Sequence, residues 1–158
     1  MTEKDKEFMR RAIYLAQNGI DKNAGGPFGA VVVKDDEIVG EGFNQVTSTN
    51  DPTAHAEIVA IRNACEKLGN FQLDGCVLYT SCEPCPMCLG AIYWARPARV
   101  FYACTREDAA NIGFDDQFIY EEIEKNFEHR QMKLVNLMRD EGLTIFENWA
   151  DKADKTKY

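Results

Sequence analysis

Three cysteines, Cys82, Cys85 and Cys88, recur at intervals of three residues in the stretch SCEPCPMC. Thiols at this spacing are typical of an iron–sulfur cluster, a structural zinc knuckle or a catalytic zinc. A bacterial ferredoxin pattern needs a fourth cysteine four residues after the third, where this chain has Ile92. A four-cysteine zinc site needs a second closely spaced pair, and the remaining cysteines are the isolated Cys65, Cys76 and Cys104. The spacing therefore disfavours the first two kinds of site.

A histidine from another element can complete a mixed site, and the chain has two of them. His129 lies among charged residues in FEHRQ, where a solvated side chain is expected. His55 begins the stretch HAE, two residues before Glu57. One imidazole and two thiolates leave the fourth position of a tetrahedral zinc open to water, and a neighbouring Glu can then transfer protons. We therefore predict a catalytic centre with His55 as ligand and Glu57 as acid–base residue.

The choice between the three cysteines follows from the helix expected at residues 86–95. Cys85 and Cys88 are three residues apart at its start, so they share a face, and free amide donors there stabilise thiolates. Cys82 lies before Pro84, on the side of the preceding strand. We predict that Cys85 and Cys88 bind the metal. Cys82 is expected to be a packed thiol, or to contact the ligands without binding the metal itself. The isolated cysteines are expected to be buried free thiols.

The elements that position these residues alternate along the chain. Apolar residues at helical spacing predict a helix over 5–18, and two β-branched runs predict a hairpin over 27–44 with its turn at Asp35 and Asp36. A turn-rich stretch then offers Asp51 or Thr53 as the cap of a helix that carries Ile58, Ile61, Cys65 and Leu68. The later elements are a strand at 76–81, the helix at 86–95, a strand at 99–104 and a helix at about 136–152. This order predicts a three-layer α/β sandwich around a mixed sheet.

Length and charge limit the class of protein. The 158 residues match one domain, 1–158, without a linker or repeat. Eighteen basic against 26 acidic residues give a net charge of −8, which disfavours binding to a nucleic-acid backbone. The N-terminal stretch MTEKDKEFMRRAIYLAQNG is too charged for a signal peptide, and no long apolar run is present. We expect a cytoplasmic protein that does not enter a membrane.

The combination of His55-Ala56-Glu57 with Pro84-Cys85-Pro86-Met87-Cys88 matches the H-x-E…P-C-x-x-C signature of zinc nucleobase deaminases. With the hairpin in front, the chain resembles the cytidine-deaminase-like superfamily, which implies an α/β/α sandwich with a mixed five-stranded sheet. Within it, GGPFGAVVVKD, NDPTAHAE, LYTSCEPCPMCLGAIYWARP, GFDDQFIY and the final Tyr158 resemble the bacterial guanine deaminases.

This resemblance implies a zinc-dependent hydrolase that converts guanine to xanthine and ammonia in purine salvage or catabolism. One Zn²⁺ per subunit would be held by His55, Cys85 and Cys88. Glu57 would take a proton from the attacking water and deliver protons to the ring nitrogen and the departing amine.

The resemblance also assigns a purine site formed by Phe28, Asn44, the Ala56 amide, Trp94 and Asp116. Phe28 would stack on the ring, Asn44 and Ala56 would bind its polar atoms, Trp94 would line the pocket and Asp116 would contact the guanine edge. Asp116 is chosen over Asp115 on alignment with the family motif alone. Without the resemblance, Phe28 and Trp94 would be expected as core aromatics.

For the C-terminal segment, about 136–158, the resemblance implies exchange between the two subunits of a homodimer, with Tyr158 closing the partner's site. Taken alone, the final stretch DKADKTKY would be expected to be a frayed tail.

Three other functions remain open at this stage. A tRNA adenosine deaminase shares the HAE and PCPMC motifs, although the acidity of the chain disfavours it, and a cytosine or amino-triazine deaminase is a second neighbour. The third is a non-catalytic interaction module stabilised by zinc, against which the intact Glu57 counts.

Overall fold

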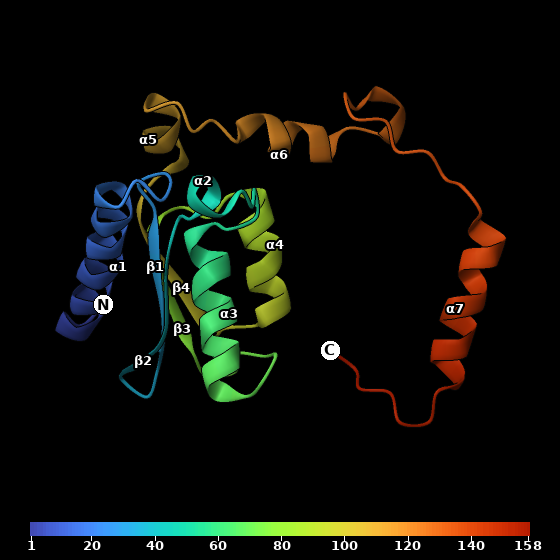
Figure 1. Ribbon diagram of the computed structural model, residues 1–158, viewed down its shortest axis with the longest axis horizontal. Coiled ribbons are helices and arrows are strands. Elements are labelled where there is room, and N and C mark those ends of the chain that lie inside the picture. Colours follow the sequence, from blue (N-terminus) through green and yellow to red (C-terminus); the bar gives the residue numbers. More distant parts are fainter. The chain divides into compact units, whose positions relative to one another are not determined.

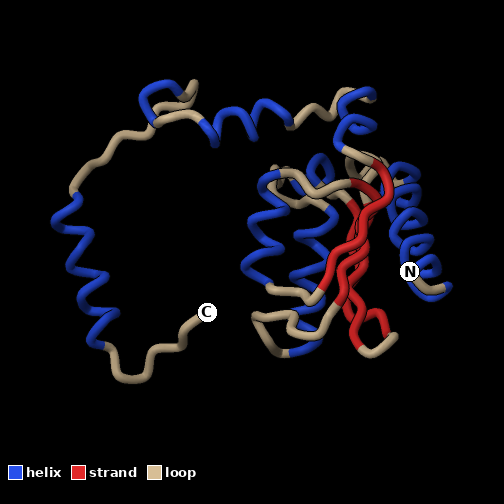
Figure 2. Tube along the Cα trace, turned by 180° about the vertical axis from the view of Figure 1, so that it is seen from behind, coloured by secondary structure: helices blue, strands red, loops and turns tan.

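A four-stranded mixed sheet is the framework of the site (Figures 1 and 2). The computed structural model describes all 158 residues, which form two compact units, 1–117 and 118–158. The sheet belongs to the first unit and has the order β2-β1-β3-β4. Its strands are β1 (Gly29–Lys34), β2 (Glu37–Phe43), β3 (Val77–Cys82) and β4 (Arg99–Cys104). β1 pairs antiparallel with β2 and β3, whereas β3 and β4 are parallel.

The prediction of five strands is wrong. A strand needs a partner to accept and donate its backbone hydrogen bonds. The stretch MKLVNLM at 132–138, which follows β4 and is largely apolar, forms neither helix nor strand in this chain. The sheet therefore ends at β4. The coarser expectation, a mixed sheet with helices, is confirmed.

Local signals set most of the elements. The hairpin turn at Asp35 and Asp36 is confirmed, and their φ angles of 50° and 64° are those of a type I′ turn. The helix α4 (Pro86–Ala95) and strand β4 match their predicted ranges. The first helix, α1 (Glu3–Asp21), is longer than expected because Thr2 and Asp5 form a capping box before its first turn.

The helix that carries the site, α3 (Ala56–Leu68), begins later than the sequence indicated. Its N-cap residue is His55, not Asp51 or Thr53. The Asp51 carboxylate instead accepts hydrogen bonds from the Thr53 N–H (2.8 Å) and hydroxyl (2.7 Å), which closes a turn ahead of the helix. As the N-cap residue, His55 has extended backbone and precedes the first turn of the helix.

Helices cover both faces of the sheet in the first unit (Figure 1). On one face, Leu15 of α1 packs against Val31 and Val33 of β1 and Tyr79 of β3. On the other face, three alanines of α3 and Ile92 of α4 pack against the alternate strand residues. This alternation is the period of two that a strand buried on both faces requires.

Close packing of α3 on the hairpin depends on two glycines of β2. A Cβ on Gly42 would lie 2.4 Å from the Ala56 carbonyl oxygen, and one on Gly40 would lie 2.4 Å from that of Ala60. Side chains at these positions would push α3 away from the sheet. The glycines thereby fix where the first turn of α3 lies.

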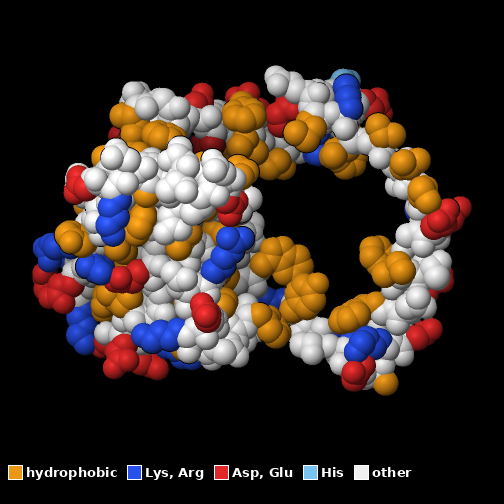
Figure 3. All heavy atoms as spheres, viewed as in Figure 1, with side chains coloured by type: hydrophobic (Ala, Val, Ile, Leu, Met, Phe, Trp, Pro, Cys, Tyr) orange, Lys and Arg blue, Asp and Glu red, His pale blue; other side chains and the backbone are white.

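The second unit contains α6 (Gln117–Glu124, which begins at the last residue of the first unit), a 3₁₀ turn (Phe127–His129) and α7 (Arg139–Asp151). α7 begins three residues later than predicted. No residue of 118–158 is buried, and large apolar side chains of this unit are exposed (Figure 3). Across the whole chain, no helix combines the length and apolarity that crossing a membrane requires.

Candidate functional site

His55 and Glu57 lie at the start of α3, on either side of Ala56. His55 is half-buried at the N-cap position. Glu57 is only 6% exposed although it carries a carboxylate. A buried acid without an ion-pair partner is costly, so its retention here indicates a chemical role.

The two predicted cysteines lie at the start of α4. Cys85 is the N-cap residue, Pro86 occupies the first turn, and Cys88 is fully buried. The Nδ1 atom of His55 lies 3.5 Å from the Sγ atom of Cys85 and 3.5 Å from that of Cys88. The sequence prediction that these three side chains meet is confirmed, since their donor atoms all lie within 4.8 Å of one another.

These distances fit a tetrahedral zinc ion. A Zn–S bond of about 2.3 Å and a Zn–N bond of about 2.0 Å at the tetrahedral angle place N and S about 3.5 Å apart. The observed 3.5 Å separations agree with that value. One nitrogen and two sulfur donors suit zinc, and they leave one position for a fourth ligand.

The ionisation of the cluster also fits a cation. Hydrogen bonds from Cys88 and His55 lower the pKa of the Cys85 thiol to about 4. The hydrogen bond with Cys85 raises the pKa of His55, and the pKa of Cys88 is raised by the hydrogen bond that it shares with Cys85 and by burial. Metal binding at a site of this kind would displace the protons that such donors hold.

Glu57 completes the centre. Burial raises the pKa of its carboxyl group, the negative charge of Cys85 acts in the same direction, and a hydrogen bond with Cys88 opposes them. A carboxyl group with a raised pKa can both accept and return a proton near neutral pH.

Cys82 differs from the other two cysteines of the motif. It is the last residue of β3, and its Sγ donates to the Thr105 carbonyl oxygen at 3.5 Å. Burial raises the pKa of this thiol to about 12, so it stays protonated. Of the isolated cysteines, Cys76 is buried as expected, Cys65 is half-buried, and the expectation of burial is wrong for Cys104, which is exposed; all are free thiols.

A cavity of about 750 Å³ opens above this centre, and His55, Glu57 and Cys85 form part of its wall. That volume is within the range of small-molecule sites. Asn44, at the end of β2, is buried in the wall, and its Oδ1 accepts the N–H groups of Gly26 (3.3 Å) and Val46 (3.2 Å). The carboxamide is therefore held in one orientation, and its NH₂ group has no hydrogen-bond partner in the protein.

Two aromatic rings form the opposite part of the wall. The rings of Phe28 and Phe114 meet edge to face, with centroids 5.0 Å apart and an interplanar angle of 88°. Such a pair fixes both ring planes. Phe114 follows α5 (Arg106–Asn111), and its N–H donates to the Ala109 carbonyl oxygen at 3.0 Å.

The two aspartates that follow Phe114 have different environments. Asp115 is exposed, and its Oδ1 accepts the Gln117 N–H at 3.0 Å in a local turn. Asp116 is half-buried in the cavity wall, and the hydrogen bond to its carboxylate comes from its own backbone N–H. Burial, followed by the negative charge of Cys85, raises the pKa of Asp116.

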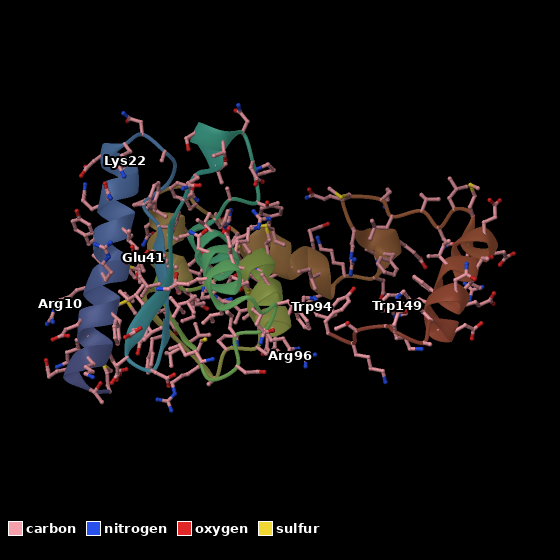
Figure 4. All side chains as sticks on the ribbon, turned by 60° about the horizontal axis from the view of Figure 1, so that its bottom comes forward. Arg10, Lys22, Glu41, Trp94, Arg96 and Trp149 are labelled. Atoms are coloured by element: carbon pink, nitrogen blue, oxygen red, sulfur yellow. The ribbon has the colours of Figure 1, made fainter.

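The other residues assigned to the purine site are placed differently. Ala56 is fully buried between His55 and Glu57 and does not line the cavity. Trp94 lies on α4 outside the cavity wall, with 64% of its side chain exposed (Figure 4). The expectation that Trp94 lines this cavity is therefore not met within the first unit. Tyr158 belongs to the second unit, where 69% of its side chain is exposed.

Several wall residues were not predicted. Glu83, Arg106 and Phe114 line the cavity together with the segment 23–26. Glu83 lies within SCEPCPMC and Phe114 within GFDDQFIY, so both belong to stretches that the sequence had already singled out. Their placement depends on the pairing of β3 with β4, which the sequence does not specify.

Comparisons with known proteins agree with the geometry. The family model of the cytidine and deoxycytidylate deaminase zinc-binding region matches residues 2–104. The chain belongs to this deaminase family. Guanine deaminase from Bacillus subtilis is 58% identical over 151 residues, covering 96% of this chain and 97% of that protein.

Two further comparisons separate the members of the family. The X-ray structure of guanine deaminase from Bacillus subtilis superposes with a TM-score of 0.94 at 57% identity, covering 97% of this chain and 98% of the other. A tRNA-specific adenosine deaminase from Buchnera aphidicola is 34% identical over 149 residues, covering 94% of this chain and 95% of that protein. Both kinds of relative span the chain, and the similarity to guanine deaminase is much greater.

Proposed function

We propose that this chain is a zinc-dependent aminohydrolase that converts guanine and water to xanthine and ammonia. The observation that carries the proposal is the cavity in which an incomplete metal ligand set, the buried Glu57, the buried Asn44 and the half-buried Asp116 carboxylate converge. The 58% identity to guanine deaminase from Bacillus subtilis supports guanine among the bases that deaminases act on.

His55, Cys85 and Cys88 would hold the zinc. When bound, Zn²⁺ supplies a hydroxide-like nucleophile at neutral pH by lowering the pKa of water. Because two anionic thiolates weaken that effect, more of the proton transfer falls on Glu57. Glu57 takes one proton of the attacking water as the water oxygen bonds to C2, and it delivers that proton to the ring nitrogen beside C2. It then moves the remaining proton of the new C2 hydroxyl group to the amine, so that the C2–N bond breaks, ammonia leaves and the C2 carbonyl of xanthine forms.

Recognition of the base would use the Asn44 NH₂ group and the Asp116 carboxylate, which both face the cavity. The Asn44 NH₂ group donates to an acceptor of the purine, and the Asp116 carboxylate accepts from its N–H groups. Phe28, held by Phe114, presents an aromatic surface for stacking. The Ala56 amide, at the start of α3, is a further donor near the reacting atoms. Adenine lacks the carbonyl acceptor that Asn44 would bind and the ring N–H donor that Asp116 would bind.

Ammonia release from a panel of free bases tests this function. We expect purified, zinc-loaded protein to convert guanine to xanthine, with adenine, cytosine and amino-triazines at least about 100-fold slower, because each mismatched hydrogen bond leaves a buried group unpaired. A tRNA anticodon stem-loop is the control for the adenosine-editing relatives. Inosine formation in that RNA with guanine untouched, or a preference for cytosine or a triazine, would overturn the assignment.

The C-terminal segment would complete the site of a second subunit in a homodimer. No residue of 118–158 is buried, and its exposed apolar side chains include Phe118, Phe146 and Trp149. The first unit has its own exposed aromatics on α4, Tyr93 and Trp94. Apolar surface of this extent in two separate parts of one chain is typical of an interface. Exchange of 136–158 between subunits would bring Tyr158 to the partner's cavity, where Trp94 would join the wall.

Mixed dimers test the exchange directly. Glu57→Gln and Tyr158→Ala homodimers are each expected to be impaired. In a heterodimer of the two chains, the subunit that keeps Glu57 receives Tyr158 from its partner, so up to about half of the wild-type activity should return. Tagged co-expression isolates the heterodimer, and sedimentation gives its mass. A monomeric protein, or a heterodimer no more active than its parents, would rule out the exchange.

A further inference from the structure

Two neighbouring strands, β3 and β4, lead to opposite parts of the cavity wall: β3 to the metal ligands and β4 to the segment that carries Asp116. β3 and β4 are parallel, and Cys82 and Cys104 are their last paired residues. One more ladder bond follows, from the Glu83 N–H to the Cys104 carbonyl oxygen at 2.9 Å. Beyond it, β3 leads to the ligands Cys85 and Cys88, whereas β4 leads to α5 and Asp116. Ligands of α/β proteins bind in such crevices at the carboxyl ends of parallel strands.

One side chain spans this divergence. The Oε2 atom of Glu83 accepts the backbone N–H of Arg106 at 3.2 Å. Arg106 is the first residue of α5, and Phe114 closes the same helix through its hydrogen bond to Ala109. Glu83 is half-buried and forms part of the cavity wall beside Asp116. The side-chain contact therefore ties the segment before the metal ligands to the segment that carries the substrate-facing carboxylate.

We infer that Glu83 is a positioning residue, which sets the place of Asp116 relative to the metal centre through its hydrogen bond to α5. This inference rests on the proposed function, in which Asp116 contacts the base. At the same end of α5, the Cys82 thiol reaches the Thr105 carbonyl, and Thr105 and Asp108 cap the helix. A loosened α5 lets the carboxylate of Asp116 move by a fraction of an ångström to an ångström, which weakens recognition more than chemistry.

A double-mutant cycle with Asp116 tests the inference, because a residue that acts through another loses its effect when the other is absent. We expect Asp116→Ala to raise KM for guanine about 10- to 100-fold, the usual loss for a charged hydrogen bond. Glu83→Ala should raise KM about 5- to 20-fold with a smaller change in kcat. In the Asp116→Ala background, Glu83→Ala should change KM less than about twofold.

A conservative variant separates the hydrogen bond from charge and from direct contact. Gln retains an acceptor oxygen at nearly the same place, so Glu83→Gln should restore KM to within about twofold of wild type. Zinc content near one per chain and an unchanged thermal midpoint show that each variant keeps the metal site and the fold. If Glu83→Ala cannot be obtained folded and loaded, Asp108→Ala loosens the same end of α5 from outside the cavity and is expected to act in the same direction.

The double-mutant cycle distinguishes the contact of Asp116 with the base from the positioning role of Glu83. If Asp116→Ala leaves KM unchanged, the proposed contact of Asp116 with the base is wrong. If Asp116→Ala raises KM but the two effects multiply, or if Glu83→Gln is as impaired as Glu83→Ala, Glu83 acts on the substrate itself and the positioning role is wrong. Coupled effects with rescue by Gln support it.

Discussion

Glu57→Gln is expected to retain one zinc per chain and to lower kcat by at least about 10³-fold. A general acid–base contributes on the order of 10²- to 10⁴-fold to one proton transfer, and Glu57 would serve more than one. Gln has the size and buried surroundings of Glu57 but cannot take a proton, so the fold and the metal ligands should be unaffected. Steady-state xanthine formation and metal analysis of the same sample measure both quantities.

Glu66→Gln is the matched control for this variant. Glu66 lies on the same helix but is exposed, and it is outside the cavity wall. Its substitution should leave kcat within about twofold of wild type, as surface changes usually do. Turnover by Glu57→Gln close to that of the control would show that another group moves the protons.

Removing either cysteine ligand should remove the metal. Cys85→Ala and Cys88→Ala each leave one thiolate and His55, which is too few ligands to hold zinc against dialysis with a mild chelator, and both should lose turnover with the ion. Cys82→Ala should keep one zinc per chain, because the Cys82 thiol is protonated and donates to Thr105. Metal content per chain after dialysis is the measurement.

The three alanine variants control for one another, since each removes one sulfur from the same eight-residue motif. Equal zinc loss in all three would mean that Cys82 is also a ligand and that the fourth position is closed. Zinc loss in Cys82→Ala alone would require a different cluster altogether.

The cysteine part of the metal centre was predictable from the sequence because its geometry is local. Cys85 and Cys88 are brought together by a single turn of helix, and Pro86 marks where that turn begins. His55 could be chosen because the chain has only one other histidine. Glu57 is two residues after His55, so it lies at the start of the same helix. That His55 and Glu57 reach these cysteines depends on how α3 packs relative to α4, and the H-x-E…P-C-x-x-C signature supplied that part of the prediction.

Features that depend on distant pairing were harder to predict. The cap of α3 was misassigned because Asp51 and His55 compete for the same role, and the hydrogen bonds of Asp51 to Thr53 decide between them. A fifth strand was expected although strand formation depends on a partner edge as well as on apolar residues. The role of Glu83 in the cavity wall becomes visible only when β3 and β4 are known to be parallel neighbours.

X-ray absorption at the zinc edge tests the central claim most directly, because it counts the sulfur and the lighter ligands of the bound ion. A centre formed by His55, Cys85 and Cys88 with one exchangeable position should show two sulfurs at about 2.3 Å and two nitrogen or oxygen atoms at about 2.0 Å. Guanine or a close analogue should alter the lighter shell and leave the sulfur shell unchanged. Three or four sulfurs around the zinc, or a ligand shell that no substrate analogue alters, would contradict an open catalytic site.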